Sequence, residues 1–202
     1  MQIFNYNPAI LDLDSYFNSI MDSPQLDGIF INVILNVEFD LKVYLPDINN
    51  SIDFNEFLDK FKNSNKIIII NMLLGYQLLT DASALDIANF NRVFVDKVYQ
   101  TIGKYPNTFY LSAISTSTLY FLRQKPKIYK IGTIITRADL GFVDVDFYIF
   151  SQYFINVDFM NELLKRNKQI MAFTSTTNYI SQLPENIRNQ LSYIIQTPSS
   201  QV

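Results

Sequence analysis

Histidine and cysteine are both absent from this chain of 202 residues. Histidine is the usual general acid or base near neutral pH and the most frequent metal ligand, whereas cysteine thiolates act as nucleophiles and bind soft metals. Their absence excludes His-dependent catalytic triads, thiol nucleophiles and ordinary zinc sites. Carboxylate, Lys, Tyr or hydroxyl chemistry, metals bound by oxygen ligands, or no chemistry at all remain, and we favour the last.

Other features are scarce as well. The chain has only five glycines, which are not clustered, so a Gly-rich phosphate loop is excluded. No cluster of Lys and Arg stands out in the sequence and the net charge is −3, so we expect no nucleic-acid ligand. The longest apolar run, Ile67–Ile70, is too short to span a membrane, and no signal peptide precedes the first acidic residues. The lack of cysteine fits a cytoplasmic protein.

An apolar fraction of 49% in a chain of this length is enough to build a sizeable core. No low-complexity segment or composition shift divides the chain. We therefore expect a single domain over residues 1–202.

Short apolar runs alternate with amphipathic segments, which is typical of βα units around a parallel sheet. The expected strands are Ile3–Tyr6, Gly28–Leu35 with an antiparallel return at Leu41–Leu45, Lys66–Asn71, Thr108–Ile114, Tyr129–Ile135, Phe147–Ser151, Gln169–Phe173 and Tyr193–Ile195. The expected helices are a segment from Asp12 to Ile20, Asp53–Lys62, Ala82–Ile102, Ser117–Gln124, Val157–Asn167 and Asn178–Leu191, the last interrupted at Pro184.

Eight main strands, most of them followed by a helix, predict an α/β fold of the (β/α)8 TIM-barrel type. Such barrels typically have about 250 residues, so this one is compact. An open doubly wound sheet has the same alternation and remains the alternative.

Six segments at strand ends carry a family resemblance. They are Asp27–Val33, Lys42–Asp47, Ile69–Leu73, Leu111–Leu119 with the following Pro126 and Gly132, Ala172–Thr174, and Tyr193–Pro198. In their order and spacing they resemble the glycerophosphodiester phosphodiesterase family over essentially the whole chain. The resemblance implies a TIM barrel with its site at the carboxyl ends of the strands, and a place in lipid metabolism.

The charged residues of that family are replaced here. The resemblance implies a divalent metal held by two Glu and one Asp, and two catalytic His. At the positions that match the three carboxylates, this chain has Phe30, Asn32 and Asn71. At the position that matches one of the two His, it has Pro46. Leu73 replaces a phosphate-binding Lys, and only Asp47 remains. The family-site positions at the barrel mouth are Tyr6, Asn7, Phe30, Asn32, Pro46, Asp47, Asn71, Leu73, Ser112, Phe173 and Thr174.

These replacements remove the family's chemistry. Mg²⁺ and Ca²⁺ need several oxygen ligands, with carboxylates to offset the charge, and Phe30 offers none. Metal-assisted phosphodiester cleavage also needs a proton donor for the leaving alkoxide. We expect no metal, no cofactor and no catalytic residue.

Two further groups of polar residues can be explained by local structure without a binding site. Arg137, Asp139, Asp144 and Asp146 form a charged segment that is either a cation site or, more often in proteins, a solvated turn. The hydroxyl-rich segments Ser112–Thr118 and Thr174–Thr177 stand at strand ends, where barrel sites are built, but helix capping accounts for them equally well.

Three functions stay open. The first is a catalytically inactive phosphodiesterase-like barrel that acts as a binding, regulatory or partner subunit, with a small polar ligand as an option. The second is a diverged phosphodiesterase acting on glycerol-phosphate type esters, and the third is a purely structural scaffold.

The resemblance ends near Pro198, and the four residues that follow are too few for a last outer helix. Without that helix, the side of the barrel between the last and first strands would be less covered, and exposed apolar residues there would favour association with a second copy or a paralogue.

Overall fold

The computed structural model describes residues 2–5, 13–44, 51–73, 83–136, 142–174 and 180–196. One sheet of ten strands runs through it, and eight of these strands are parallel neighbours. The eight are β1 (Gln2–Asn5), β2 (Leu26–Leu35), β5 (Ile67–Met72), β6 (Phe109–Ala113), β7 (Lys130–Ile135), β8 (Phe147–Ser151), β9 (Gln169–Thr174) and β10 (Leu191–Gln196). The expected strands are all present, with ends that differ by a few residues.

The parallel strands close into a ring. β1 pairs with β10, with Ile3 opposite Ile195, and on its other side with β2, with Phe4 opposite Ile29. An open doubly wound sheet would leave two free edges, so this double pairing excludes it. The predicted TIM-barrel fold class is therefore confirmed.

A short antiparallel extension shares an edge of β2 with β1. The first half of that edge pairs with β1, whereas Val33 to Leu35 pair with β3 (Leu41–Val43), which in turn pairs with β4 (Ile52–Asp53). This edge of the long β2 thus pairs with two strands, while its other edge pairs with β5. The sequence predicted the return at β3 but not β4, because two residues are too few to show a strand pattern.

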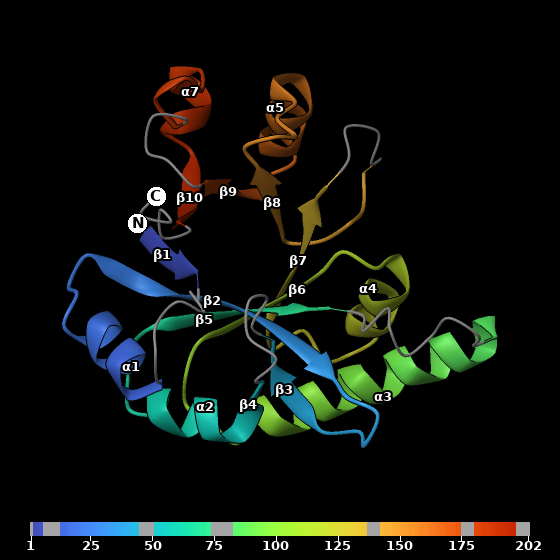
Figure 1. Ribbon diagram of the computed structural model, residues 1–202. Coiled ribbons are helices and arrows are strands. Elements are labelled where there is room, and N and C mark those ends of the chain that lie inside the picture. Colours follow the sequence, from blue (N-terminus) through green and yellow to red (C-terminus); the bar gives the residue numbers. More distant parts are fainter. Residues whose placement is uncertain are drawn as a thin grey trace.

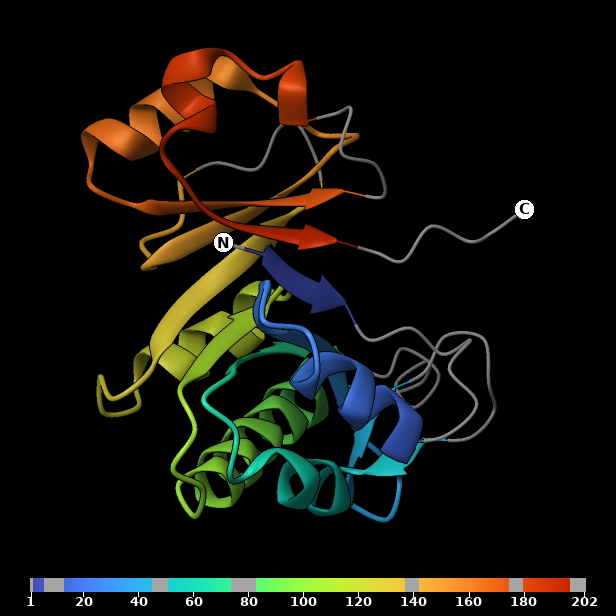
Figure 2. The same cartoon turned by 90° about the vertical axis from the view of Figure 1, so that its left-hand side faces the viewer.

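Helices lie outside the strands (Figures 1 and 2). They are α1 (Leu13–Met21), α2 (Phe54–Phe61), α3 (Ala84–Ile102), α4 (Thr116–Arg123), α5 (Val157–Lys165) and α7 (Glu185–Arg188). In Figure 2, α5 and α7 lie on one side of the strands and α1 to α3 on the other. The described part of the chain has no helix between β7 and β8 and none after β10. None of the described helices is long and apolar enough to cross a bilayer.

Local signals fix the helix starts. The Asp53 carboxylate accepts hydrogen bonds from the backbone N–H groups of Asn55 and Glu56 at the start of α2. Ser83 and Asp86 form a reciprocal capping box at the start of α3. Both arrangements satisfy N–H groups that have no partner inside the helix, which stabilises each helix where the sequence predicted one.

The last predicted helix is wrong in its extent. Pro184 ends the preceding turn and α7 follows as four residues, while Leu191, expected at the end of the helix, is the first residue of β10. Leu191 lies opposite Ile170 of β9. Pairing with a neighbouring strand therefore overrides the helical spacing of this segment.

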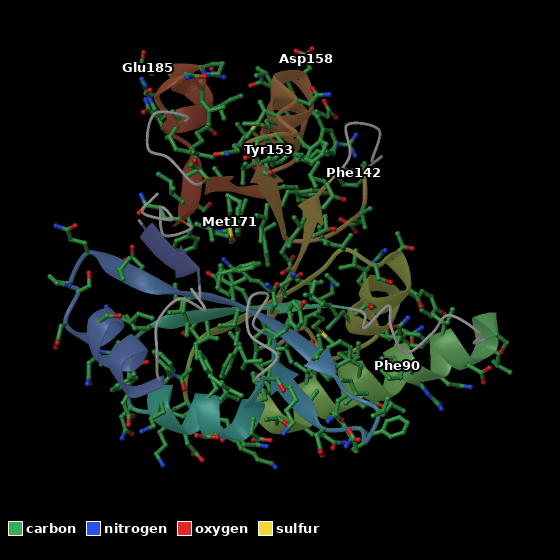
Figure 3. The ribbon with its side chains drawn as sticks, viewed as in Figure 1. Phe90, Phe142, Tyr153, Asp158, Met171 and Glu185 are labelled. Carbon is green, nitrogen blue, oxygen red and sulfur yellow. The ribbon has the colours of Figure 1, made fainter. Side chains whose placement is uncertain are left out.

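Two apolar layers hold the barrel. The larger layer lies between the strands and the helices, and its central members include the fully buried Phe57, Phe61 and Phe94. The smaller layer fills the interior of the ring, and Met171 is one of its members (Figure 3). It consists of Phe30, Ile69, Tyr110, Phe147, Ile149, Met171, Tyr193 and Ile195. The barrel is thus a packed core and not a pore.

Gly132 makes this interior possible. A Cβ atom at position 132 would lie 2.2 Å from the ring of Phe147, which is fully buried. The Phe147 ring therefore occupies the volume that the side chain of any other amino acid at position 132 would need.

Replacing Gly132 by Ala should destabilise the protein by about 1 to 3 kcal/mol, because the Phe147 ring must leave its position in a closely packed interior. Urea unfolding followed by circular dichroism measures the change. Gly103→Ala at the end of α3 is the matched control, because there the added atom has its nearest neighbour at 3.2 Å. Equal stability losses for the two variants would contradict this account of the interior.

Candidate functional site

Three polar side chains form a hydrogen-bonded chain inside the barrel near the carboxyl ends of adjacent strands. The Asn71 Nδ2 atom donates to Asn32 Oδ1 at 2.7 Å, and the Ser112 hydroxyl lies 3.5 Å from Asn71 Oδ1 and 3.4 Å from the carbonyl oxygen of Ile70. Asn32 of β2, Asn71 of β5 and Ser112 of β6 are register partners across the sheet. The closed ring thus brings together residues that are up to 80 positions apart in the sequence.

Two of the three residues are shielded from water, whereas Asn32 is half-buried. Asn71 is 3% exposed and Ser112 is fully buried. Buried amides and hydroxyls are stable only when they are hydrogen-bonded, and each of these groups has a partner. The three residues therefore satisfy one another, so the amide oxygens of Asn32 and Asn71 already accept hydrogen bonds from protein groups.

An aromatic pair lies beside this chain. The ring of Phe30 on β2 meets the ring of Phe173 on β9 edge to face, with 5.6 Å between the centroids. Phe30 is 2% exposed. β2 and β9 are not neighbours in the ring, so this contact crosses the barrel interior. Leu73, just beyond β5, is half-buried and donates its backbone N–H to the carbonyl of Val33.

The remaining family-site positions divide into two groups. Thr174 is buried on the outer side of β9, where its hydroxyl donates to Gln152 Oε1 at 3.0 Å, so it is not part of the Asn32–Ser112 chain. Tyr6, Asn7, Pro46 and Asp47 lie outside the described residues. The structure therefore brings together Phe30, Asn32, Asn71, Ser112 and Phe173, and it separates Thr174 from them.

Two tyrosines lie in the interior below the site. The rings of Tyr110 and Tyr193 meet edge to face with centroids 6.1 Å apart. Burial, together with a hydrogen bond to Tyr110, raises the pKa of Tyr193 to about 12. Its phenol therefore stays protonated at neutral pH and does not act as a base.

The charged segment forms ordinary surface contacts. Asp144 pairs with Lys168 at 2.8 Å, and Asp146 accepts the backbone N–H of Ile131 at 2.8 Å. Lys168 holds the pKa of the Asp144 carboxyl below its usual value. Arg137 and Asp139 lie outside the described residues. Among the described residues, no group of three or more His, Cys, Asp or Glu lies close enough to bind a metal. The solvated-turn interpretation therefore fits Asp144 and Asp146.

A surface hollow of about 350 Å³ lies at the other end of the barrel. It is lined by Asp59 of α2 and by Lys62, Asn63, Lys104, Tyr105 and Pro106 of the turns before β5 and β6. Active sites of TIM barrels lie at the carboxyl ends of the strands. This hollow is therefore not the site that the family positions predict.

Comparisons with known proteins point to one architecture. No family model and no curated protein sequence matches the chain. Among solved structures, a glycerophosphodiester phosphodiesterase from Parabacteroides distasonis superposes with a TM-score of 0.71 over 96% of this chain and 92% of its own, at 10% identity. A phosphodiesterase from Oleispira antarctica, solved with its product sn-glycerol-3-phosphate, gives a TM-score of 0.70 over 97% and 92%, at 9% identity.

This chain has the fold of the glycerophosphodiester phosphodiesterases. The resemblance stated from the six sequence segments is therefore confirmed at the level of the fold. At such low identity the likeness carries no statement about chemistry, which depends on the side chains of the site.

The side chains do not fit the divalent metal that the resemblance implies. Phe30, at the first carboxylate position, is a buried ring packed on Phe173, and the amides at the other two positions bind each other. A hard cation needs charged oxygens that are free to coordinate it. The described positions supply none, so no reaction step through a metal follows from them.

Sequence reasoning identified the positions but missed the contacts. The Phe30–Phe173 pair joins residues 143 positions apart, and nothing local in the sequence links them. The one available signal was that both residues stand at family-site positions. The Asn32–Asn71 hydrogen bond follows from register, which only the folded sheet sets.

Replacing Asn71 by Ala should lower the free energy of unfolding by about 1 to 3 kcal/mol, because Asn32 Oδ1 would lose its donor inside the barrel. A double-mutant cycle with Asn32→Ala should give a coupling of about 0.5 to 1.5 kcal/mol. Denaturant unfolding measures all four corners of the cycle. Strict additivity would show that the two amides do not interact.

Proposed function

We propose that this protein is a catalytically inactive relative of the glycerophosphodiester phosphodiesterases that acts as a binding, regulatory or partner subunit. The observation that carries the proposal is the Phe30–Phe173 contact, because an apolar ring fills the place of a metal-binding carboxylate. The reducing compartment suggested by the lack of cysteine makes a cytoplasmic location part of the same proposal.

Charge and polarity support the proposal. Phosphodiester cleavage develops negative charge that a metal or cationic side chains must stabilise. At the five family-site positions that lie together, the side chains are Phe30, Asn32, Asn71, Ser112 and Phe173, and none carries a positive charge. A small polar ligand remains part of the proposal and would meet the half-buried Asn32, whereas a phosphate would meet no cation at these positions.

The protein should not hydrolyse phosphodiesters. With added Mg²⁺, Ca²⁺ or Mn²⁺, release of p-nitrophenol from bis(p-nitrophenyl) phosphate and of glycerol phosphate from a glycerophosphodiester should equal the rate without protein. The alternative function, a diverged phosphodiesterase, predicts metal-dependent hydrolysis that falls when Asn32, Asn71 or Ser112 is replaced by Ala. That outcome would overturn the proposal.

Restoring the family's carboxylates should create a metal site. We expect the triple variant Phe30→Glu, Asn32→Asp, Asn71→Glu to be less stable than the natural protein without metal, because like charges would share a buried site. Millimolar Ca²⁺ or Mg²⁺ should raise its melting temperature by about 5 °C through preferential binding to the folded state.

The natural protein should show no such shift. A second control carries the same added charge at exposed positions, Asn18→Asp, Asn55→Asp and Asn63→Glu, and should not respond to metal either. A natural protein that gains as much as the triple variant would contradict the idea that Phe30 removed the metal site.

We also propose that the barrel associates with a second copy or a paralogue through the outer side of β10. Its outward side chains, Ser192, Ile194 and Gln196, stay only half-buried, which supports an interface of mixed polarity. Light scattering at micromolar concentration should give a dimer mass that Ile194→Arg reduces to the monomer. A monomer mass for the natural protein would remove this part of the proposal.

A further inference from the structure

Positive charge gathers at one end of the barrel. The turns that lead from a helix into the next strand, together with residues 142–147 before β8, all lie at the amino-terminal ends of the strands. From the last residue of each helix to the first of the following strand, these turns hold eleven of the sixteen Lys and Arg. With residues 142–147 they hold only three of the nineteen Asp and Glu, namely Asp22, Asp144 and Asp146. We name this end of the barrel the cationic face.

The cationic residues are Lys62, Lys66, Lys104, Arg123, Lys125, Lys127, Lys130, Lys165, Arg166, Lys168 and Arg188. Because the whole chain has a net charge of −3, the rest of the molecule is strongly acidic. Charge is therefore distributed unevenly between these turns and the rest of the chain.

Helix capping explains only part of this excess. Cations stabilise the partial negative charge at a helix carboxyl end, and the effect falls off within the last turn. Six of the eleven cations lie beyond the helix caps: Lys66, Lys104, Lys125, Lys127, Lys130 and Lys168. Most of the charge on this face therefore has no role in ending a helix.

Internal ion pairs also leave much of the charge free. Lys125 pairs with Asp96, Arg166 with Glu162, Lys168 with Asp144 and Lys62 with Asp59. The Lys66 ammonium donates to the carbonyls of Ser23 and Leu26. Among the described residues, Lys104, Arg123, Lys127 and Lys165 form no ion pair with a carboxylate, and all four are exposed. Arg123 and Lys127 attract the Asp144 carboxylate only at longer range, and Asp144 already pairs with Lys168.

Apolar side chains project from the same face. Ile128 is 70% exposed in the turn between Lys127 and Lys130, and Phe142 is 41% exposed beside the start of β8 (Figure 3). The guanidinium of Arg166 stacks 4.2 Å from the centre of the Phe142 ring, and the Lys168 ammonium lies 5.9 Å from it. Two exposed apolar side chains therefore stand among the cations of this face.

We propose that the cationic face docks on an anionic phospholipid surface. Cations are drawn to the negative headgroups, while Ile128 and Phe142 reach the boundary with the acyl chains, which is the combination that holds peripheral proteins on membranes. A nucleic acid would pair with the cations but offers no apolar layer for Ile128. The inference is independent of the function proposed above, because it uses the opposite end of the barrel.

Vesicle sedimentation tests this docking. The natural protein should sediment with phosphatidylcholine vesicles that contain about 30% phosphatidylglycerol, stay in solution with phosphatidylcholine alone, and be released at about 0.5 M NaCl. Lys127→Glu should weaken the partition about tenfold. Ile128→Ser should weaken it about fivefold through lost apolar burial.

Matched controls separate the face from general charge and hydrophobicity. Arg92→Glu on α3 makes the same charge change away from the face, and Leu85→Ser removes an apolar side chain of equal exposure, 69%, at the start of α3. Neither control should change the partition. Circular dichroism confirms that every variant is folded.

Three results would overturn the proposal. They are no sedimentation with anionic vesicles at low salt, equal effects of Lys127→Glu and Arg92→Glu, or tighter binding to single- or double-stranded DNA than to vesicles at the same ionic strength.

Discussion

Closure of the strand ring is the constraint on which the rest of the structure depends. β1 bonds to β10 on one side and to the first half of the β2 edge on the other, so every parallel strand has two neighbours. The second half of the β2 edge is taken by the antiparallel β3. Closure removes the free edges of the parallel ring and fixes which residues face the interior.

The two ends of the closed barrel differ in chemistry. At the carboxyl ends of the strands, neutral amides, a hydroxyl and two Phe rings satisfy and cover one another. At the amino-terminal ends, Lys and Arg dominate the surface. Barrels of this kind place their sites at the carboxyl ends of the strands, where this chain has a polar but uncharged interior, whereas many of its cations lie at the opposite end.

Aromatic contacts connect the residues of the interior. Gly132 gives room to Phe147, and Phe147 meets Tyr110, which in turn contacts Tyr193. This packed layer supports the Asn32–Asn71–Ser112 chain from below. At the mouth, Phe30 and Phe173 meet in an edge-to-face contact that stabilises the fold.

The sequence by itself determined the elements and their order. Alternation of buried strands such as Ile67–Met72 with amphipathic helices such as Phe54–Phe61 is a local pattern, and caps such as Asp53 mark where helices begin. Only the tertiary structure decided which distant residues are in contact, as in the Asn32–Asn71 hydrogen bond and the Phe30–Phe173 pair. It also decided that β10 starts at Leu191 and that the cations share one face. Lys62, Lys104, Lys127 and Lys168 form no run in the sequence, because each follows a different helix. They share one surface because closure of a parallel ring places all the turns that enter its strands at the same end.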